Sequence, residues 1–233
     1  MENSERWPFR QDDPQWANEL MWDRDQVIET HTRGNSASRR KARELLRKFK
    51  SGNTIGNEGC LLTSLAMVLR LLDQPDREPP WTPSVLNQRA HELLYYTKAG
   101  LSMAPLYADI VSEVTGGEVQ LCAKEEYLSG KSSWPRNYAS TCWIVRAYRL
   151  LPPEMRAHFA VMLKTGTYDD TVASHYVLLD PTRPGSPDEN DAYLLDPAMP
   201  MNAEAAWRLS DSARQICKDA QIRRQWVTSP LFQ

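Results

Sequence analysis

The run from Cys60 to Leu72 is apolar on nearly every side and is interrupted only by Thr63, Ser64 and Arg70. A helix that is apolar all round has to be covered on every side by other elements. The Gly- and Asn-rich residues 51–59 before it are typical of a turn. The run is also too short to cross a bilayer of about 30 Å. We therefore expect a buried helix that begins at Cys60, inside a globular core.

The composition excludes several classes of protein. The chain has 233 residues, 41% of them hydrophobic and 25% charged, which is enough for one well-filled core or two small ones. A net charge of −2 gives no general reason to expect nucleic acid or a membrane as a partner. The first residues lack a basic region followed by an apolar one, so we expect no secretory signal and a cytoplasmic location.

The cysteines do not form a metal-binding pattern. The chain has 4 of them, Cys60, Cys122, Cys142 and Cys217, and contains neither a C-x-x-C nor an H-x-x-x-H spacing. We expect reduced thiols, no metal and no cofactor. Three of these thiols are interpreted as small buried side chains, two in strands and Cys217 on a helix. Cys60 differs because it follows a glycine turn at a helix start, where the backbone N–H groups favour a thiolate.

The order of the elements predicts an α+β fold in a single domain over residues 1–233. Further helices are expected over 83–98 and 103–115, and the tail from Ala203 to Trp226 is expected to be helical. Between them, short β-rich runs separated by turn residues predict a mostly antiparallel sheet. These runs are E-V-Q-L-C-A, C-W-I-V-R-A-Y, H-F-A-V-M-L-K, H-Y-V-L-L-D and D-A-Y-L-L-D-P.

One segment carries a concentrated charge. Residues 33–50 hold eight basic side chains against Glu44, a net charge of +7. The apolar residues within it recur at helical spacing, at Ala42, Leu45, Leu46 and Phe49. We interpret it as the solvated face of a basic helical insertion at about residues 21–50. The alternative is a patch that binds an acidic partner or nucleic acid.

A thiol nucleophile needs an imidazole within hydrogen-bond reach and a group that orients the imidazole. Two histidines are poorly placed, His31 in the polar insertion and His91 on the second predicted helix. His158 and His175 each open a β-run, and each is followed by an Asp-Pro, at Asp180 and Asp196 respectively. If the last three β-runs form a meander, His175 and Asp196 lie at the same edge of the sheet. The spacing therefore favours His175, and His158 with Asp180 remains the alternative.

Three stretches resemble a known family. They are T-I-G-N-E-G-C-L-L-T-S-L-A-M-V-L, S-H-Y-V-L-L and D-A-Y-L-L-D-P-A, and they are similar to the papain-like cysteine peptidases related to the bacteriocin-processing, double-glycine leader peptidases. The resemblance implies that Cys60 is the nucleophile, His175 the general base and acid, and Asp196 the residue that orients His175. Relatives often carry Q-x-D-x-x-W near the start, which is Q-D-D-P-Q-W here and implies Gln11 as an oxyanion donor.

Two features depart from the family pattern. A long stretch separates Gln11 from Cys60, so Gln15 and Asn57 remain alternatives for the oxyanion donor. Residue 61 is Leu where many relatives have Gly.

The resemblance implies a cysteine endopeptidase that cleaves a protein or peptide after small residues such as Gly-Gly, without a cofactor. Free-standing domains of this kind are similar to antibacterial effector toxins that are delivered into a target-cell cytoplasm by a secretion system and inhibited by a cognate immunity protein. The same triad order also serves amidases and transglutaminase-like acyl transferases. A third possibility is an inactive binding module whose basic segment docks an acidic partner.

Overall fold

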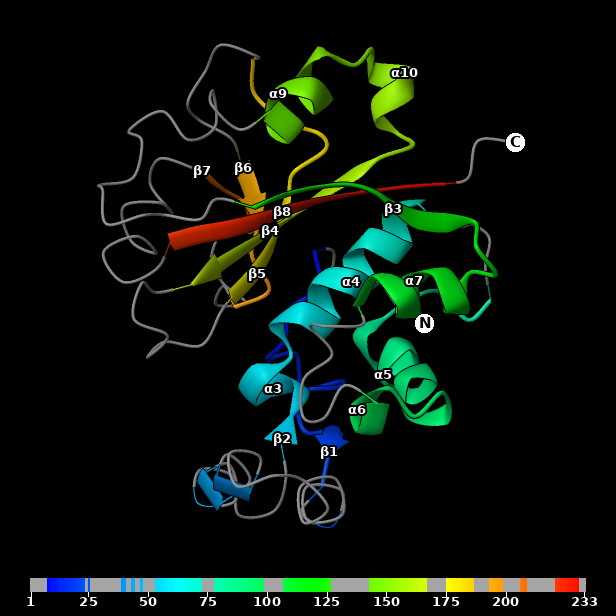
Figure 1. The fold of residues 1–233 in the computed structure, drawn as a ribbon, viewed down its shortest axis with the longest axis vertical. Coiled ribbons are helices and arrows are strands. Elements are labelled where there is room, and N and C mark those ends of the chain that lie inside the picture. Colours follow the sequence, from blue (N-terminus) through cyan, green and yellow to red (C-terminus); the bar gives the residue numbers. More distant parts are fainter. Residues whose placement is uncertain are drawn as a thin grey trace.

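A computed structural model gives the arrangement of most of the chain (Figure 1). It describes residues 8–23, 25, 39–40, 43–44, 47, 53–72, 78–98, 107–126, 143–166, 175–186, 193–198, 206–208 and 221–230. Helices and strands are both present, and the helices come mainly before the strands in sequence. The α+β class predicted from the sequence is therefore confirmed.

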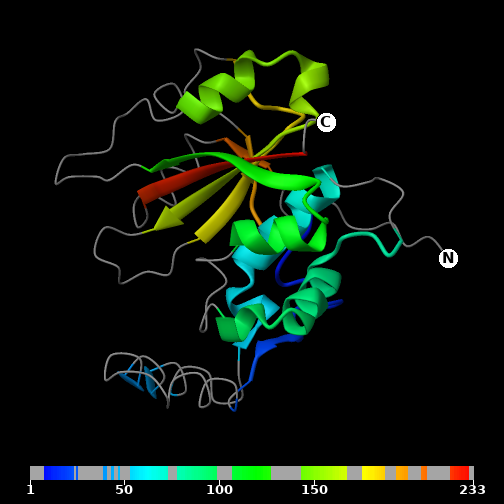
Figure 2. The same cartoon turned by 45° about the vertical axis from the view of Figure 1, so that its right-hand side comes forward.

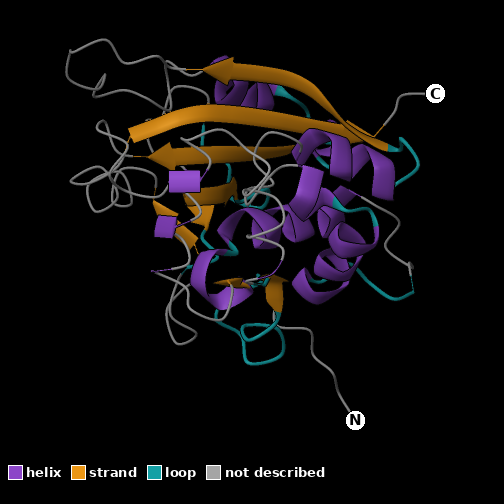
Figure 3. Ribbon diagram, turned by 60° about the horizontal axis from the view of Figure 1, so that its bottom comes forward, coloured by secondary structure: helices purple, strands orange, loops and turns teal. Residues whose placement is uncertain are grey.

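The main sheet is antiparallel throughout its described pairings. Its strands stand in the order β3, β8, β4, β5, β6, β7. Their bounds are Val119–Glu126 for β3, Ala160–Gly166 for β4, His175–Leu179 for β5, Tyr193–Leu195 for β6, Ala206–Arg208 for β7 and Gln221–Pro230 for β8. Strands β4, β5 and β6 are consecutive neighbours, so the predicted meander is confirmed. Figure 3 shows the long strands gathered on one side of the molecule and most of the helices on the other.

The buried helix predicted from the sequence is α4, Cys60–Leu72, which begins at Cys60 as expected. Every residue from Leu61 to Leu69 is buried, and the core formed by this helix includes Met162 of β4 and Leu178 of β5. Burial on all sides explains why its apolar residues show no polar face. No helix among the described residues is long and apolar enough to span a membrane.

The region expected as a single helix over 83–98 is divided in two. Helix α5 covers Pro83–Glu92, and Thr82 caps it by accepting a hydrogen bond from the Val85 N–H at 3.2 Å. Helix α6 covers Tyr95–Lys98. The break between them lies at Leu94, whose positive φ of 58° is incompatible with a continuing right-handed helix.

The third expected helix, over 103–115, is α7, which the structure describes over Tyr107–Val114. Its end lies one residue before the expected one, and residues 103–106 lie outside the described part of the chain.

The strand predicted at C-W-I-V-R-A-Y is wrong, because Trp143–Leu150 forms helix α9. Val145, Tyr148 and Arg149 are its buried residues, a spacing of three and four that belongs to a helix face. In the sequence this helix resembles a strand because it starts with a short apolar run. Its helical spacing is hidden because one of the later buried positions is occupied by the charged Arg149. Arg149 is buried because its Nε donates to the Pro184 carbonyl at 2.6 Å. Figure 2 shows α9 with α10, Pro153–Arg156, across the sheet from α4.

The predicted helical tail over Ala203–Trp226 is also wrong. Strands β7 and β8 lie in this region, and β8 pairs with β3 on one side and β4 on the other. Its Gln and Arg residues favour a helix locally, but hydrogen bonds along both edges of a central strand outweigh that preference. The tail therefore supplies a central strand of the sheet.

A two-stranded ribbon marks the base of the basic insertion. Strand β1, Leu20–Trp22, pairs antiparallel with β2, Asn53–Thr54, so that Trp22 lies opposite Asn53. Between them the structure describes Arg39, Arg40, Arg43, Glu44 and Arg47 as exposed helical residues. Their exposure agrees with a solvated basic face, whereas the apolar positions Ala42, Leu45, Leu46 and Phe49 lie outside the described residues.

Removing core contacts of α4 tests this architecture. Leu65 is 0% exposed, so Leu65→Ala is expected to lower the free energy of unfolding by about 2–5 kcal/mol through lost burial and the cavity left behind. Urea denaturation measures the change. The matched control Leu150→Ala, at a side chain that is 64% exposed, is expected to change stability by less than about 0.5 kcal/mol. Equal effects of the two variants would contradict the placement of α4.

Candidate active site

Cys60 is the first residue of α4 and is half-buried. A short helix, α3 at Ile55–Glu58, leads into it through Gly59. The Gly59 N–H donates to the Ile55 carbonyl at 2.7 Å, and the Gly59 carbonyl accepts from the Thr63 N–H at 2.8 Å. A side chain at Gly59 would come within 2.6 Å of Ile55 Cγ2 and closer still to the Ile55 carbonyl oxygen. The glycine before Cys60 is therefore required by close packing.

A side-chain hydrogen bond attaches the start of α4 to strand β5. Ser64, one helical turn after Cys60, donates from its buried hydroxyl to the Tyr176 carbonyl at 3.1 Å. The four-residue step from Cys60 to Ser64 corresponds to about 6 Å along the helix axis. Tyr176 directly follows His175, the first residue of β5. The backbone of His175 therefore lies beside the first turn of the Cys60 helix.

Asp196 directly follows β6 and is 8% exposed. Its Oδ1 accepts a hydrogen bond from the Ala198 N–H at 2.8 Å, which fixes the turn after the strand. Leu195 pairs with Leu178 of β5, and one further step of that register puts Asp196 opposite Val177. Strand β5 therefore has His175 at the end of the pair where Asp196 lies.

Gln11 links the two sides of this region. Its backbone N–H donates to the Pro197 carbonyl at 2.9 Å, next to Asp196. Its side-chain Nε2 donates to the Gly56 carbonyl at 3.1 Å, in the helix that precedes Cys60. The alternatives Gln15 and Asn57 are both exposed, and Gln15 uses its backbone N–H to bond Asp13 at 3.0 Å.

The Q-D-D-P-Q-W run is held in place by its own Asp and Trp. The Asp13 carbonyl accepts hydrogen bonds from the Trp16 and Ala17 N–H groups at 3.0 and 2.8 Å. The Trp16 indole donates to the Arg10 carbonyl at 2.6 Å and packs edge-on against Phe9. Phe9 and Trp16 are both buried and anchor this segment in the core. These contacts fix the backbone on both sides of Gln11.

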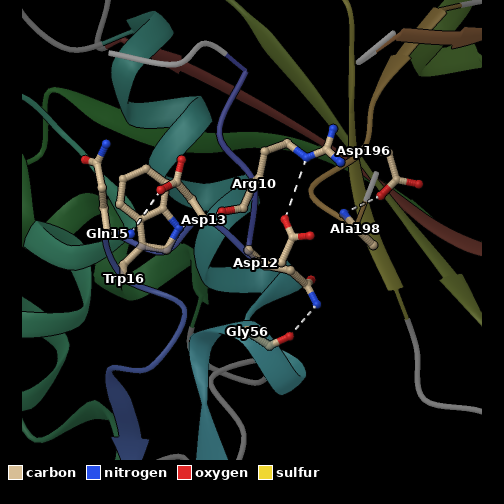
Figure 4. A network of polar contacts seen from close by, with 9 residues as sticks. Arg10, Asp12, Asp13, Gln15, Trp16, Gly56, Asp196 and Ala198 are labelled. Atoms are coloured by element: carbon tan, nitrogen blue, oxygen red, sulfur yellow. Dashed lines mark hydrogen bonds and ion pairs between the residues drawn. The ribbon is translucent and has the colours of Figure 1, made fainter. Parts of the chain in front are cut away.

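Arg10 is a residue that the sequence reasoning missed. It is 5% exposed, and its Nε and Nη2 atoms are buried without a hydrogen-bond partner among the described residues. Burial lowers the pKa of Arg10 from its ordinary value, while attraction to the carboxylates of Asp12 and Asp196 opposes that change. Figure 4 shows the Arg10 side chain extending from the N-terminal segment toward Asp196. The signal in the sequence is its position directly before Gln11.

The alternative pair, His158 and Asp180, lies at the other end of β4 and β5 from His175. His158 is exposed in the turn before β4, at the end of that strand opposite to Thr165, which pairs with His175. Asp180 accepts hydrogen bonds from the Thr182 N–H and hydroxyl at 2.9 and 2.6 Å and pairs with Arg183 at 3.1 Å. Asp180 therefore already closes a local turn.

The remaining candidate residues either make other contacts or lie outside the described part of the chain. The His91 ring lies 2.9 Å from the Leu20 carbonyl and packs against Tyr96, away from Cys60. Cys122 is in strand β3 as expected, whereas Cys142, Cys217 and His31 lie outside the described residues. Among the described residues, no group of three or more His, Cys, Asp or Glu side chains is arranged to hold a metal ion.

The chain matches no protein-family model, no curated protein and no solved structure. The site therefore has to be judged on its own geometry. That geometry brings the backbones of Gln11, Cys60, His175 and Asp196 to one region, where a helix start meets the ends of two neighbouring strands.

The packing at Gly59 yields a direct test. Gly59→Ala is expected to force α3 away from α4 and to lower the free energy of unfolding by about 1–3 kcal/mol, as overpacking does. Urea denaturation measures this. The control is Gly116→Asn, since Asn tolerates the positive φ of 65° there and nothing lies within 4 Å of a Cβ at that position. A Gly59→Ala variant as stable as this control would show that the turn before Cys60 is not tightly packed.

Proposed function

We propose that the chain is a papain-like cysteine endopeptidase with Cys60 as nucleophile, His175 as general base and acid, Asp196 as the residue that orients His175, and Gln11 as an oxyanion donor. The observation that supports it best is the double attachment of the Cys60 region. Ser64 bonds it to β5 beside His175, and Gln11 connects Gly56 with Pro197. An α+β fold with a buried helix against an antiparallel sheet is also consistent with this fold family.

The chemistry divides into two acyl-transfer steps. His175 takes the thiol proton of Cys60, and the sulfur attacks the peptide carbonyl carbon to give a tetrahedral oxyanion. The C–N bond then breaks, and the amine leaves with the proton from His175, so that a thioester remains on Cys60. Water attacks the thioester while His175 accepts its proton, and the acid product leaves as the thiol is restored.

The side-chain amide of Gln11 is suited to the oxyanion. Its Nε2 carries two N–H donors, of which one bonds the Gly56 carbonyl. The second is available to a negatively charged oxygen that forms near the start of α4, together with the backbone N–H of Cys60. Donors held in place before the reaction stabilise the developing charge without further reorganisation.

The substrate and setting follow from the family resemblance. A segment with small residues such as Gly-Gly before the cut would let the backbone come close to Cys60. The biological role proposed here is an antibacterial effector toxin, which acts in a target-cell cytoplasm and is inhibited by a cognate immunity protein.

Peptide cleavage by single-site variants tests the mechanism. Cys60→Ala and His175→Ala are each expected to reduce cleavage of Gly-Gly peptides by at least about a thousandfold, because a nucleophile and its base act as a unit. Gln11→Ala is expected to lose about 10²–10³ in kcat. His158→Ala is the matched control, since that residue is exposed at the far end of β4. Mass spectrometry of the products reports both cleavage and any transfer to added amines.

The outcomes separate the competing activities. Cleavage that persists in Cys60→Ala would remove this thiol from the mechanism. Products joined to an amine acceptor, or release of peptidoglycan fragments without peptide cleavage, would indicate an acyl transferase or an amidase. A Cys60 that reacts with iodoacetamide no faster than the other thiols would favour an inactive binding module.

Growth of producing cells tests the proposed role. Expression of the unaltered chain in bacterial cytosol is expected to arrest growth, whereas Cys60→Ala at the same protein level is expected to leave growth unchanged. Colony counts after induction measure the difference. Equal growth of both strains would argue against a toxin.

A further inference from the structure

The burial of Arg10 is not explained by its contribution to stability. The side chain is 5% exposed, and in the part of the chain that the structure describes its Nε and Nη2 have no hydrogen-bond acceptor. Its ion pair with Asp12 is long, at 4.0 Å, and the Asp12 side chain is 52% exposed, so solvent screens the attraction. A buried cation with unmet N–H groups costs free energy, and an apolar residue of similar size is often as stable or more stable.

Of the two described carboxylates that attract the Arg10 charge, Asp12 and Asp196, the buried one is Asp196. Asp196 is 8% exposed and attracts the Arg10 charge. The two segments are also joined directly, because the N–H of Gln11 donates to the carbonyl of Pro197 at 2.9 Å. Figure 4 shows the Arg10 side chain extending toward Asp196, whose carboxylate accepts from the Ala198 N–H. Attraction between charges away from water is less screened than attraction at the surface.

The backbone of Arg10 is fixed on its other side. The Trp16 indole and the Asp13 N–H both donate to the Arg10 carbonyl, at 2.6 and 3.3 Å. The guanidinium therefore extends from a rigid turn, and its position relative to Asp196 is set by the same hydrogen bonds that position Gln11.

We propose that Arg10 is a positioning residue, whose buried positive charge holds the Asp196 carboxylate in place at the end of β6 and, through it, the His175 imidazole. This inference rests on the proposed function, since it assigns Arg10 to the same Cys60, His175 and Asp196 group. Arg10 acts through Asp196 and does not itself contact the reacting atoms.

Two substitutions at position 10 separate positioning from structural support. Arg10→Met keeps the length and removes the charge, and Arg10→Lys keeps the charge. Three quantities are measured on the full chain: the rate of Cys60 alkylation by iodoacetamide, kcat and KM on the Gly-Gly peptide that the unaltered protein cleaves, and the free energy of unfolding.

We expect Arg10→Met to lower the reactivity of Cys60 without lowering the stability of the fold. Arg10→Met is expected to lower kcat and the alkylation rate by roughly tenfold to a hundredfold, the range seen when an outer partner of a functional side chain is removed. KM is expected to stay within about twofold, and the free energy of unfolding to stay unchanged or to rise because a buried cation is gone. Arg10→Lys is expected to restore most of the lost kcat. A purely structural residue would instead lose stability and show no rescue by Lys.

A double variant identifies Asp196 as the intermediary. In the Asp196→Asn background, Arg10→Met is expected to cause no further loss of kcat or alkylation rate, because the charge it supports is already absent. Additive losses, or an Arg10→Met variant indistinguishable from the unaltered protein, would overturn the inference. Failure of the proposed function is recognised separately, by cleavage that survives in Cys60→Ala.

Discussion

Gln11 makes two hydrogen bonds that hold the candidate site together. Its backbone N–H donates to Pro197 and its side chain to Gly56, so a single residue spans from the turn after β6 to the helix before Cys60. These two segments are far apart in sequence and belong to different layers of the fold. Because both bonds come from one residue, a shift of the N-terminal segment would change the distance between Cys60 and Asp196.

The N-terminal segment shows a conflict between stability and local charge. Trp16, Phe9 and Asp13 hold its turn through ordinary burial and hydrogen bonding. Arg10 does the opposite, since it brings a cation into the interior and two of its nitrogens find no acceptor among the residues described. Costs of this kind are common where side chains have to be held in a set arrangement before a ligand arrives.

The sequence predicts best where one element is determined by its own pattern. The start of helix α4 is predicted correctly, because an apolar surface on every side leaves burial as the sole solution. The β4 to β6 meander is also predicted, since its strands follow one another in sequence and each pairs with the next. Both β8 and α9 were predicted wrongly. The position of β8 depends on pairing with β3 and β4, and that of α9 on packing against the sheet, which are contacts that no local pattern records.

The candidate site, too, can be predicted only in part from local sequence patterns. The backbone positions of Cys60, His175, Asp196 and Gln11 fall in one region, while the roles assigned to them remain predictions. Arg10 was missed because an arginine beside a polar turn is typical of an exposed residue. Its surroundings include the turn at Asp196 and Pro197, which is far away in sequence and reaches the N-terminal segment only through the fold.

The β1–β2 ribbon has a consequence for the basic segment that it encloses. Trp22 and Asn53 are paired, so the chain leaves and returns at the same point, and Gly56 N–H bonds to Ala17 at 2.9 Å just inside that point. Each doubling of a flexible loop's length costs only about 0.6 kcal/mol in closure entropy. The length and charge of the basic segment can therefore change during evolution at little thermodynamic cost, while the candidate site beyond the ribbon keeps its geometry.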